Sequence, residues 1–187
     1  MTYEMDIAGL KRQLPICKVS DDLYIGAFIL FGDVELTVHC AAELLKRVPE
    51  YDILIAPEAK AIPLAYEMAR QSGANYYIIA RKNIKAYMGK AFGVEVRSIT
   101  TAFNQKLYLD ETDAENMRGK RVLILDDVIS TGASVNAVRA LVEEAGGIVV
   151  GCAAPVAEGE AFDREDIVAL ARLPLFNADG SVKDLKI

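Results

Sequence analysis

Cysteine and histidine are scarce in this chain of 187 residues, which contains three cysteines and one histidine. Cys17, Cys40 and Cys152 are far apart, and none belongs to a C-x-x-C pair. A disulfide scaffold and a zinc site are therefore excluded on composition, and a reducing, cytoplasmic location is expected. We assign no role to His39.

The chain also lacks an excess of basic residues and lacks long apolar stretches. The formal net charge is −6, so we expect no nucleic-acid partner, because proteins that coat nucleic acids are normally basic. The longest apolar run, Leu23 to Phe31, is too short to cross a bilayer, so no membrane partner is expected. The first residues lack the pattern of a basic start followed by an apolar stretch, which predicts that there is no signal peptide.

The remaining composition, 52% hydrophobic and 26% charged, is that of a globular protein, and we expect a single domain over residues 1–187. Apolar runs alternate with segments of helical periodicity. The alternation predicts an α/β fold in which helices cover a parallel sheet. The expected strands span residues 52–56, 76–80, 121–125 and 148–156, and the expected helices span 61–73 and about 133–146.

Two stretches interrupt this alternation. Residues 83–110 contain short alternating segments, which predict an inserted flexible β hairpin with a mobile tip. Residues 1–48 hold a strand-like segment from Leu23 to Leu30 and a helix from about Val34, and we expect them to form a small N-terminal cap. The core would then span residues 49–160, and residues 161–187 would form a C-terminal extension.

The segment after the third expected strand carries the chemistry. Asp126 and Asp127 follow four apolar residues, at the carboxyl end of a strand, where open α/β sheets bind ligands. Adjacent carboxylates can accept hydrogen bonds from the vicinal hydroxyls of a ribose. A short Ser-Thr-Gly loop then opens into a helix, and backbone amides at a helix start bind phosphate. The segment therefore predicts a sugar site beside a phosphate site.

This segment closely resembles the signature of type I phosphoribosyltransferases, which bind 5-phosphoribosyl-1-pyrophosphate (PRPP). The resemblance extends over about residues 23–180, and the layout is similar to the adenine and xanthine phosphoribosyltransferase branch. It implies a type I phosphoribosyltransferase fold, and it implies that Asp126 and Asp127 hold the ribose hydroxyls. The residues that it assigns to the 5-phosphate are Ser130, Thr131, Gly132, Ala133 and Ser134.

Further elements of the resemblance imply how the leaving pyrophosphate is bound. Lys60, after the first core strand, and the pair Arg81-Lys82, after the second, would face it. Ser98 and Thr100 would belong to the flexible loop that closes over PRPP. Mg²⁺ would be the cofactor, without direct protein ligands, and the protein would be a homodimer.

The acceptor base is expected to be a purine. Ser130 stands where hypoxanthine/guanine enzymes typically carry an Asp, and an apolar Leu30 would leave an oxo group of xanthine unpaired. Phe28 could stack on a purine, and Glu158 could accept a hydrogen bond from an exocyclic amine. These residues favour adenine. Transfer to xanthine or another nucleobase, and a non-catalytic PRPP-binding regulator, stay open as alternatives.

Overall fold

A parallel sheet forms the centre of the computed structural model, which describes residues 1–88, 91–96 and 105–183. Its strand order is β11-β10-β8-β4-β5, and every neighbouring pair is parallel. The short β9 (Val128–Ile129) pairs with β10 beyond the end of β8. The five strands are β4 (Ile53–Pro57), β5 (Ile78–Ala80), β8 (Arg121–Leu125), β10 (Ile148–Glu158) and β11 (Ile167–Leu173).

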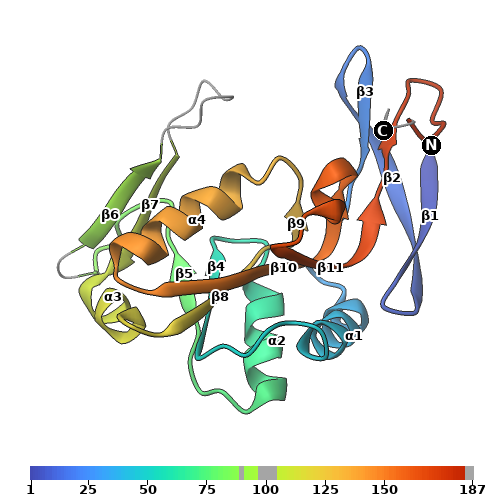
Figure 1. Cartoon of the computed structure of the whole chain (residues 1–187). Coiled ribbons are helices and arrows are strands. Elements are labelled where there is room, and N and C mark those ends of the chain that lie inside the picture. Colours follow the sequence, from blue (N-terminus) through green and yellow to red (C-terminus); the bar gives the residue numbers. More distant parts are fainter. Residues whose placement is uncertain (89–90, 97–104, 184–187) are drawn as a thin grey trace.

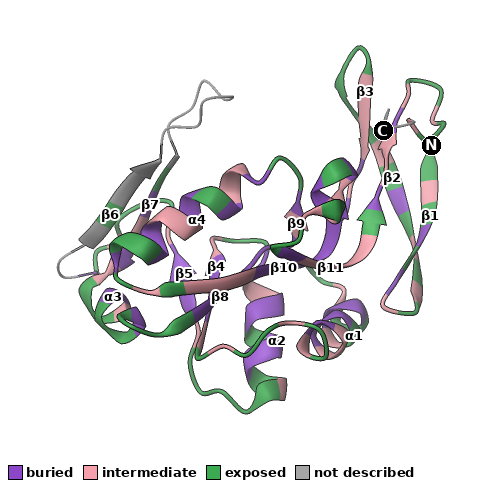
Figure 2. Ribbon diagram, in the orientation of Figure 1, coloured by how far each residue is buried: buried purple, intermediate pink, exposed green. Residues whose placement is uncertain are grey.

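Helices cover both faces of this sheet (Figures 1 and 2). The helices α1 (Val34–Leu45) and α2 (Ile62–Ser72) pack on one face, and α3 (Glu111–Met117) and α4 (Ala133–Glu144) pack on the other. The expected α/β fold and the predicted helices after β4 and β8 are confirmed.

The central strand β8 explains why the sheet is buried on both sides. Leu123 and Leu125 contact the core that includes α1 and α2, whereas Val122 and Ile124 contact the core that includes α3 and α4. Successive strand side chains point to opposite faces, so a fully apolar strand requires a cover on each face. All four side chains are fully buried.

The inserted hairpin is formed by β6 (Ala91–Val96) and β7 (Gln105–Asp110), which pair antiparallel. Buried Leu107 and Leu109 attach β7 to the core beside α4. The expected tip of the hairpin, with Ser98 and Thr100, lies outside the described residues.

A second, antiparallel sheet stands at the N-terminal side of the molecule (Figure 1). Its order is β1-β2-β3-β12, with strands β1 (Thr2–Ile7), β2 (Leu10–Ser20), β3 (Leu23–Gly26) and β12 (Leu175–Phe176). The sequence reasoning did not identify the β1–β2 hairpin. Its turn, Ala8-Gly9, has positive φ at both residues, and a glycine between two alternating runs is a signal that was available.

Three strand boundaries differ from the expectation. The strand β5 begins at Ile78 rather than Tyr76, and β10 continues to Glu158 rather than Val156. The strand from Leu23 ends at Gly26 rather than Leu30, because the chain then leaves the sheet and crosses toward α1. The side chains still alternate: Phe28 and Leu30 are buried while Ile29 and Phe31 are exposed, which is the pattern that resembled a longer strand. The segment after β10 forms a 3-10 turn and then β11, which belongs to the central sheet.

None of the described helices is long and apolar enough to cross a membrane. The division into cap, core and C-terminal extension stays a prediction.

Candidate active site

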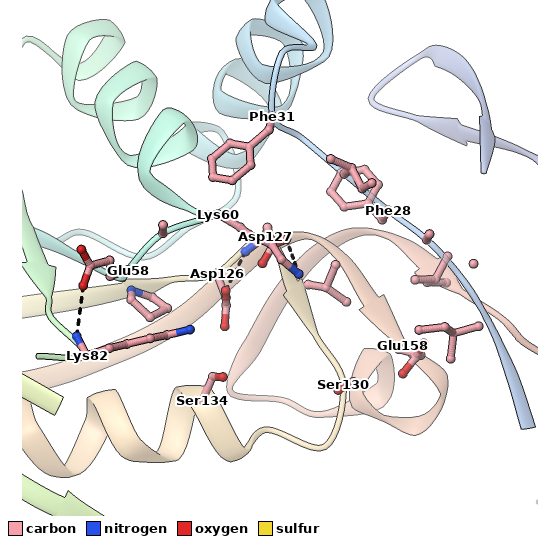
Figure 3. A pocket seen from close by; sticks show the side chains of 18 of the residues that line it. Phe28, Phe31, Glu58, Lys60, Lys82, Asp126, Asp127, Ser130, Ser134 and Glu158 are labelled. Carbon is pink, nitrogen blue, oxygen red and sulfur yellow. Dashed lines mark hydrogen bonds and ion pairs between the residues drawn. The ribbon is translucent and has the colours of Figure 1, made fainter. Parts of the chain in front are cut away.

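The carboxyl ends of β4, β5, β8 and β10 open into one cavity of about 650 Å³ (Figure 3). Strand order explains this convergence, because β8 lies between β4 and β10 and all three strands run in the same direction. Segments that are distant in sequence thus meet at one edge of the sheet. The predicted site residues that line the cavity are Phe28, Lys60, Lys82, Asp126, Asp127, Ser130, Ser134 and Glu158.

The acidic pair sits at the centre of this edge. Asp126 and Asp127 are 7% and 6% exposed. The Asp126 amide donates to the Ala153 carbonyl of β10 at 3.0 Å, and the Asp127 amide donates to Asp126 Oδ1 at 2.9 Å. Asp127 Oδ2 is buried without a hydrogen-bond partner among the described residues; its nearest cation, Lys60 Nζ, is 3.9 Å away. A buried carboxylate oxygen without a donor suits a ligand that supplies hydroxyl groups.

Burial also changes the acidity of Asp126. Desolvation, and then the neighbouring charge of Asp127, raise the pKa of Asp126 from 3.8 to about 7. The hydrogen bond from the Asp127 amide and the charge of Lys60 act in the opposite direction and lower the pKa of Asp126 in part. A donor or cation placed beside the pair would favour its charged form.

The loop after β9 joins the acidic pair to α4 and forms a second, smaller cavity of about 60 Å³. The Ala133 amide lies 3.4 Å from Thr131 Oγ1, and Gly132 is the N-cap of α4. Hydroxyl groups and the first amides of α4 therefore converge where a phosphate group would be bound. The predicted phosphate residues that line this cavity are Ser130, Thr131, Gly132, Ala133 and Ser134.

Only glycine fits at the turn of this loop. Gly132 has a φ of 80°, which is strained for any residue with a Cβ. A Cβ atom there would also lie 2.7 Å from the Arg164 guanidinium. Asp166 accepts from Arg164 Nε and NH2 at 3.0 and 2.9 Å, which fixes this guanidinium behind the loop.

Basic side chains line the side of the cavity opposite the phosphate loop, and Glu58 organises them. Its carboxylate accepts from the Lys82 amide at 3.2 Å and lies 3.5 Å from both Arg81 NH1 and Lys85 Nζ. Burial acts to raise the pKa of Glu58, but the Lys82 amide, Lys85 and Arg81 together outweigh it and lower the pKa. These cations around one carboxylate, together with Lys60 and Lys82 in the cavity lining, suit a multiply charged anion.

The structure does not bring Arg81 into the cavity lining. Its backbone pairs with Tyr108 of β7, and its guanidinium lies beside Glu58, so it contributes charge through Glu58 rather than from the cavity lining. Lys85 and Glu58 were not among the predicted site residues. A lysine four residues after Arg81, in a loop that follows a core strand, was the available signal for Lys85.

The remaining wall of the cavity is apolar and comes from the segment between β3 and α1. Phe28 lines it, as expected, and so do Ile29 and Phe31 (Figure 3). Leu30 does not line it: this side chain is 1% exposed and packs in the core with α1 and α2. Phe31, which is half exposed, takes the place expected for Leu30 in the lining beside Phe28.

Glu158, at the end of β10, closes this wall. Burial raises the pKa of its carboxyl group. No described residue donates a hydrogen bond to this carboxyl group, so it can accept one from a ligand.

Comparison with known proteins identifies the family. The profile of the phosphoribosyl transferase domain matches residues 37–174, which include all four strand ends of the site. The adenine phosphoribosyltransferase of Petrotoga mobilis is 30% identical over 156 residues, 81% of this chain and 75% of that protein. The orotate phosphoribosyltransferase of Caldanaerobacter subterraneus is 28% identical over 147 residues, 78% of this chain and 63% of that protein.

A solved structure shares the fold. The adenine phosphoribosyltransferase of Thermoanaerobacter pseudethanolicus has a TM-score of 0.63 at 22% identity, covering 76% of this chain and 84% of that one. With the signature segment located at the carboxyl end of the central strand, the chain belongs to the phosphoribosyl transferase domain family and has its type I fold.

Proposed function

We propose that this chain transfers the 5-phosphoribosyl group of PRPP to adenine, releasing pyrophosphate and forming the nucleoside monophosphate. The observation that carries the proposal is the buried pair Asp126-Asp127, with one oxygen left unpartnered among the described residues, between a phosphate loop and a group of cations. Ribose hydroxyls fit the pair, a 5-phosphate fits the loop, and pyrophosphate fits the cations.

The reaction breaks the bond between ribose C1 and the pyrophosphate oxygen, and a base nitrogen forms the new bond to C1. Positive charge develops on the sugar and negative charge on the leaving group. Asp126 and Asp127 would hold the ribose and stabilise its positive charge, while Lys60 and Lys82 would stabilise the pyrophosphate. The fixed positions of these groups bring C1 and the base nitrogen together.

Mg²⁺ fits this site, because Asp127 Oδ2 has no hydrogen-bond partner among the described residues and could accept from water or hydroxyl groups around the ion. When bound, Mg²⁺ would neutralise charge on the pyrophosphate oxygens. Asp126 and Asp127 are the residues that would hold it, through these hydroxyls or water.

Adenine fits the apolar wall. Phe28 and Phe31 offer aromatic faces, and Glu158 offers an acceptor without a competing partner among the described residues. An exocyclic amine would donate to Glu158, whereas an oxo group would face a carboxylate without a donor. This assignment replaces Leu30 with Phe31 as the second apolar contact.

Transfer to another nucleobase is the second candidate, supported by the orotate phosphoribosyltransferase among the relatives. The predicted homodimer, cytoplasmic location and absence of nucleic-acid and membrane partners stay predictions, as does a regulator without activity.

The first prediction concerns the acidic pair. Asp126→Asn and Asp127→Asn should each lower turnover about tenfold to hundredfold, since a hydrogen bond to a charged group contributes about 1.5–3 kcal/mol. Pyrophosphate release with PRPP and adenine measures this, and Asp21→Asn, at an exposed carboxylate in the turn between β2 and β3, is the control. Near-normal rates in both variants would refute the ribose assignment.

The cations give the second prediction. Lys60→Ala and Lys82→Ala should each raise the KM for PRPP about tenfold or more while changing the KM for the base less, because each loses a charged contact to pyrophosphate. Arg81→Ala should follow the same direction with a smaller effect, because Arg81 acts from behind Glu58. Steady-state kinetics measure the KM for PRPP and the KM for the base separately. Lys46→Ala, at the exposed C-cap of α1, is the control. An unchanged KM for PRPP in all three site variants contradicts the pyrophosphate assignment.

Base choice is the third prediction. In competition at equal concentrations, adenine should be consumed before xanthine, hypoxanthine, guanine and orotate. Glu158→Gln should weaken adenine use and leave the KM for PRPP unchanged, because this carboxyl group faces only the base. Chromatography of the nucleotide products measures both. Preference for another base would reject adenine and leave the PRPP assignment standing, whereas no product with any base would favour a regulator.

The fourth prediction concerns stability. The pKa of Asp126 is about 7 in the folded protein and ordinarily 3.8, so ionisation of this group opposes folding as pH rises. The Tm of Asp126→Asn should therefore equal that of the wild type near pH 4. The Tm difference in favour of the variant should grow as the pH rises to about 7 and stay constant at higher pH. A relief of only 1 kcal/mol would raise Tm by about 2–4 °C.

Thermal unfolding across this pH range measures the effect. Asp166→Asn is a control of opposite sign, because Arg164 lowers the pKa of Asp166, so its loss should destabilise the protein once the pH exceeds the ordinary pKa. A pH-independent Tm difference for Asp126→Asn would contradict the burial argument.

A further inference from the structure

The segment that forms the apolar wall of the cavity belongs to no regular element. Residues 27–32 connect β3 to α1, and Ala27, Phe28, Ile29 and Phe31 line the cavity (Figure 3). A segment outside the regular hydrogen bonds of helices and strands keeps a fixed shape only if its ends are held. The contacts at its two ends therefore determine how the wall faces a base.

Strand β2 holds both ends. At the start of the segment, the Ala27 amide donates to the Pro15 carbonyl at 2.8 Å. At its end, Arg12 Nε and NH2 donate to Asp33 Oδ2 and Oδ1 at 2.6 and 3.0 Å. Leu14, between these two contacts, is buried in the same core as Phe28 and Leu30. One short stretch of β2 thus supports the whole wall from behind.

The contact at Asp33 also fixes the start of α1. Asp33 is the N-cap residue: its Oδ1 accepts from the Leu36 amide at 3.0 Å, and its carbonyl accepts from Thr37 Oγ1 at 2.7 Å. The guanidinium of Arg12 reaches a third carboxylate oxygen, Glu35 Oε2, at 2.8 Å. Arg12 therefore ties β2 to the last turn of the wall and to the first turn of α1.

This ion pair differs from an ordinary surface pair. Single exposed pairs contribute about 0–1 kcal/mol, because both side chains are mobile and solvated. Here the contact is bidentate, and the side chains of Arg12 and Asp33 are 26% and 27% exposed. The bidentate geometry fixes direction as well as distance.

We propose that Arg12 is a positioning residue for the base: through Asp33 it holds the segment 27–33 in the shape that presents Phe28 and Phe31 to the cavity. The inference rests on the proposed function. Arg12 does not line the cavity, and it lies before the residues 37–174 that match the family profile.

The test compares Arg12→Met, which keeps the aliphatic stem, with Lys11→Met. Lys11 is the matched control, because it is adjacent on β2, pairs with Glu4 of the same hairpin and is 72% exposed. Arg12→Met should raise the KM for adenine by about tenfold, the effect of losing a charge-assisted contact, with the KM for PRPP unchanged. Arg12→Lys should restore part of the affinity for adenine, and Lys11→Met should match the wild type.

Hydrogen–deuterium exchange without substrate gives a second readout. Exchange at the Leu36 and Thr37 amides and over residues 27–33 should be faster in Arg12→Met than in Lys11→Met. If the wild type transfers phosphoribosyl groups but Arg12→Met changes neither exchange nor the KM for adenine, the positioning role is wrong. A parallel rise in the KM for PRPP would also overturn it, because the effect would then be general. A wild type without transfer to any base would refute the proposed function, and the role of Arg12 toward the base with it, even if exchange changes as expected.

Discussion

The site depends on keeping two adjacent carboxyl groups out of water at the end of the central strand. Apolar β8 extends the buried sheet up to Asp126 and Asp127, and the pair remains 6–7% exposed. This burial opposes ionisation of Asp126 and leaves Asp127 Oδ2 without a donor among the described residues. The fold tolerates the free-energy cost of burying these carboxyl groups because pairing with β10 fixes the backbone of β8 and β9 around them. A ligand with hydroxyl groups would relieve this cost by donating to the buried oxygen.

The same edge of the sheet holds two positively polarised groups apart from each other. Glu58 gathers Lys82, Lys85 and Arg81 on one side, while the α4 amides form the phosphate loop on the other. Groups that are already in place need little reorganisation when charge develops during the reaction. The strand order sets their separation, because neighbouring parallel strands deliver one group each.

The apolar wall of the cavity does not come from the carboxyl ends of the parallel strands. Its wall comes from a connection between the two sheets and is supported from behind by β2 of the antiparallel sheet. The acidic pair, the loop before α4 and Glu158 therefore lie within the residues that match the family profile, whereas the apolar wall precedes these residues and packs against the antiparallel sheet.

The sequence by itself determined the central strand, the acidic pair and the phosphate loop, because these features are local and continuous in the chain. It also determined the parallel sheet and the inserted hairpin through periodicity. Only the tertiary structure decided that Phe31, and not Leu30, faces the cavity, because the direction of a side chain outside a strand depends on what holds both ends of its segment. Likewise, the cluster around Glu58 and the support from Arg12 join residues that are distant in sequence, and no local pattern encodes such contacts.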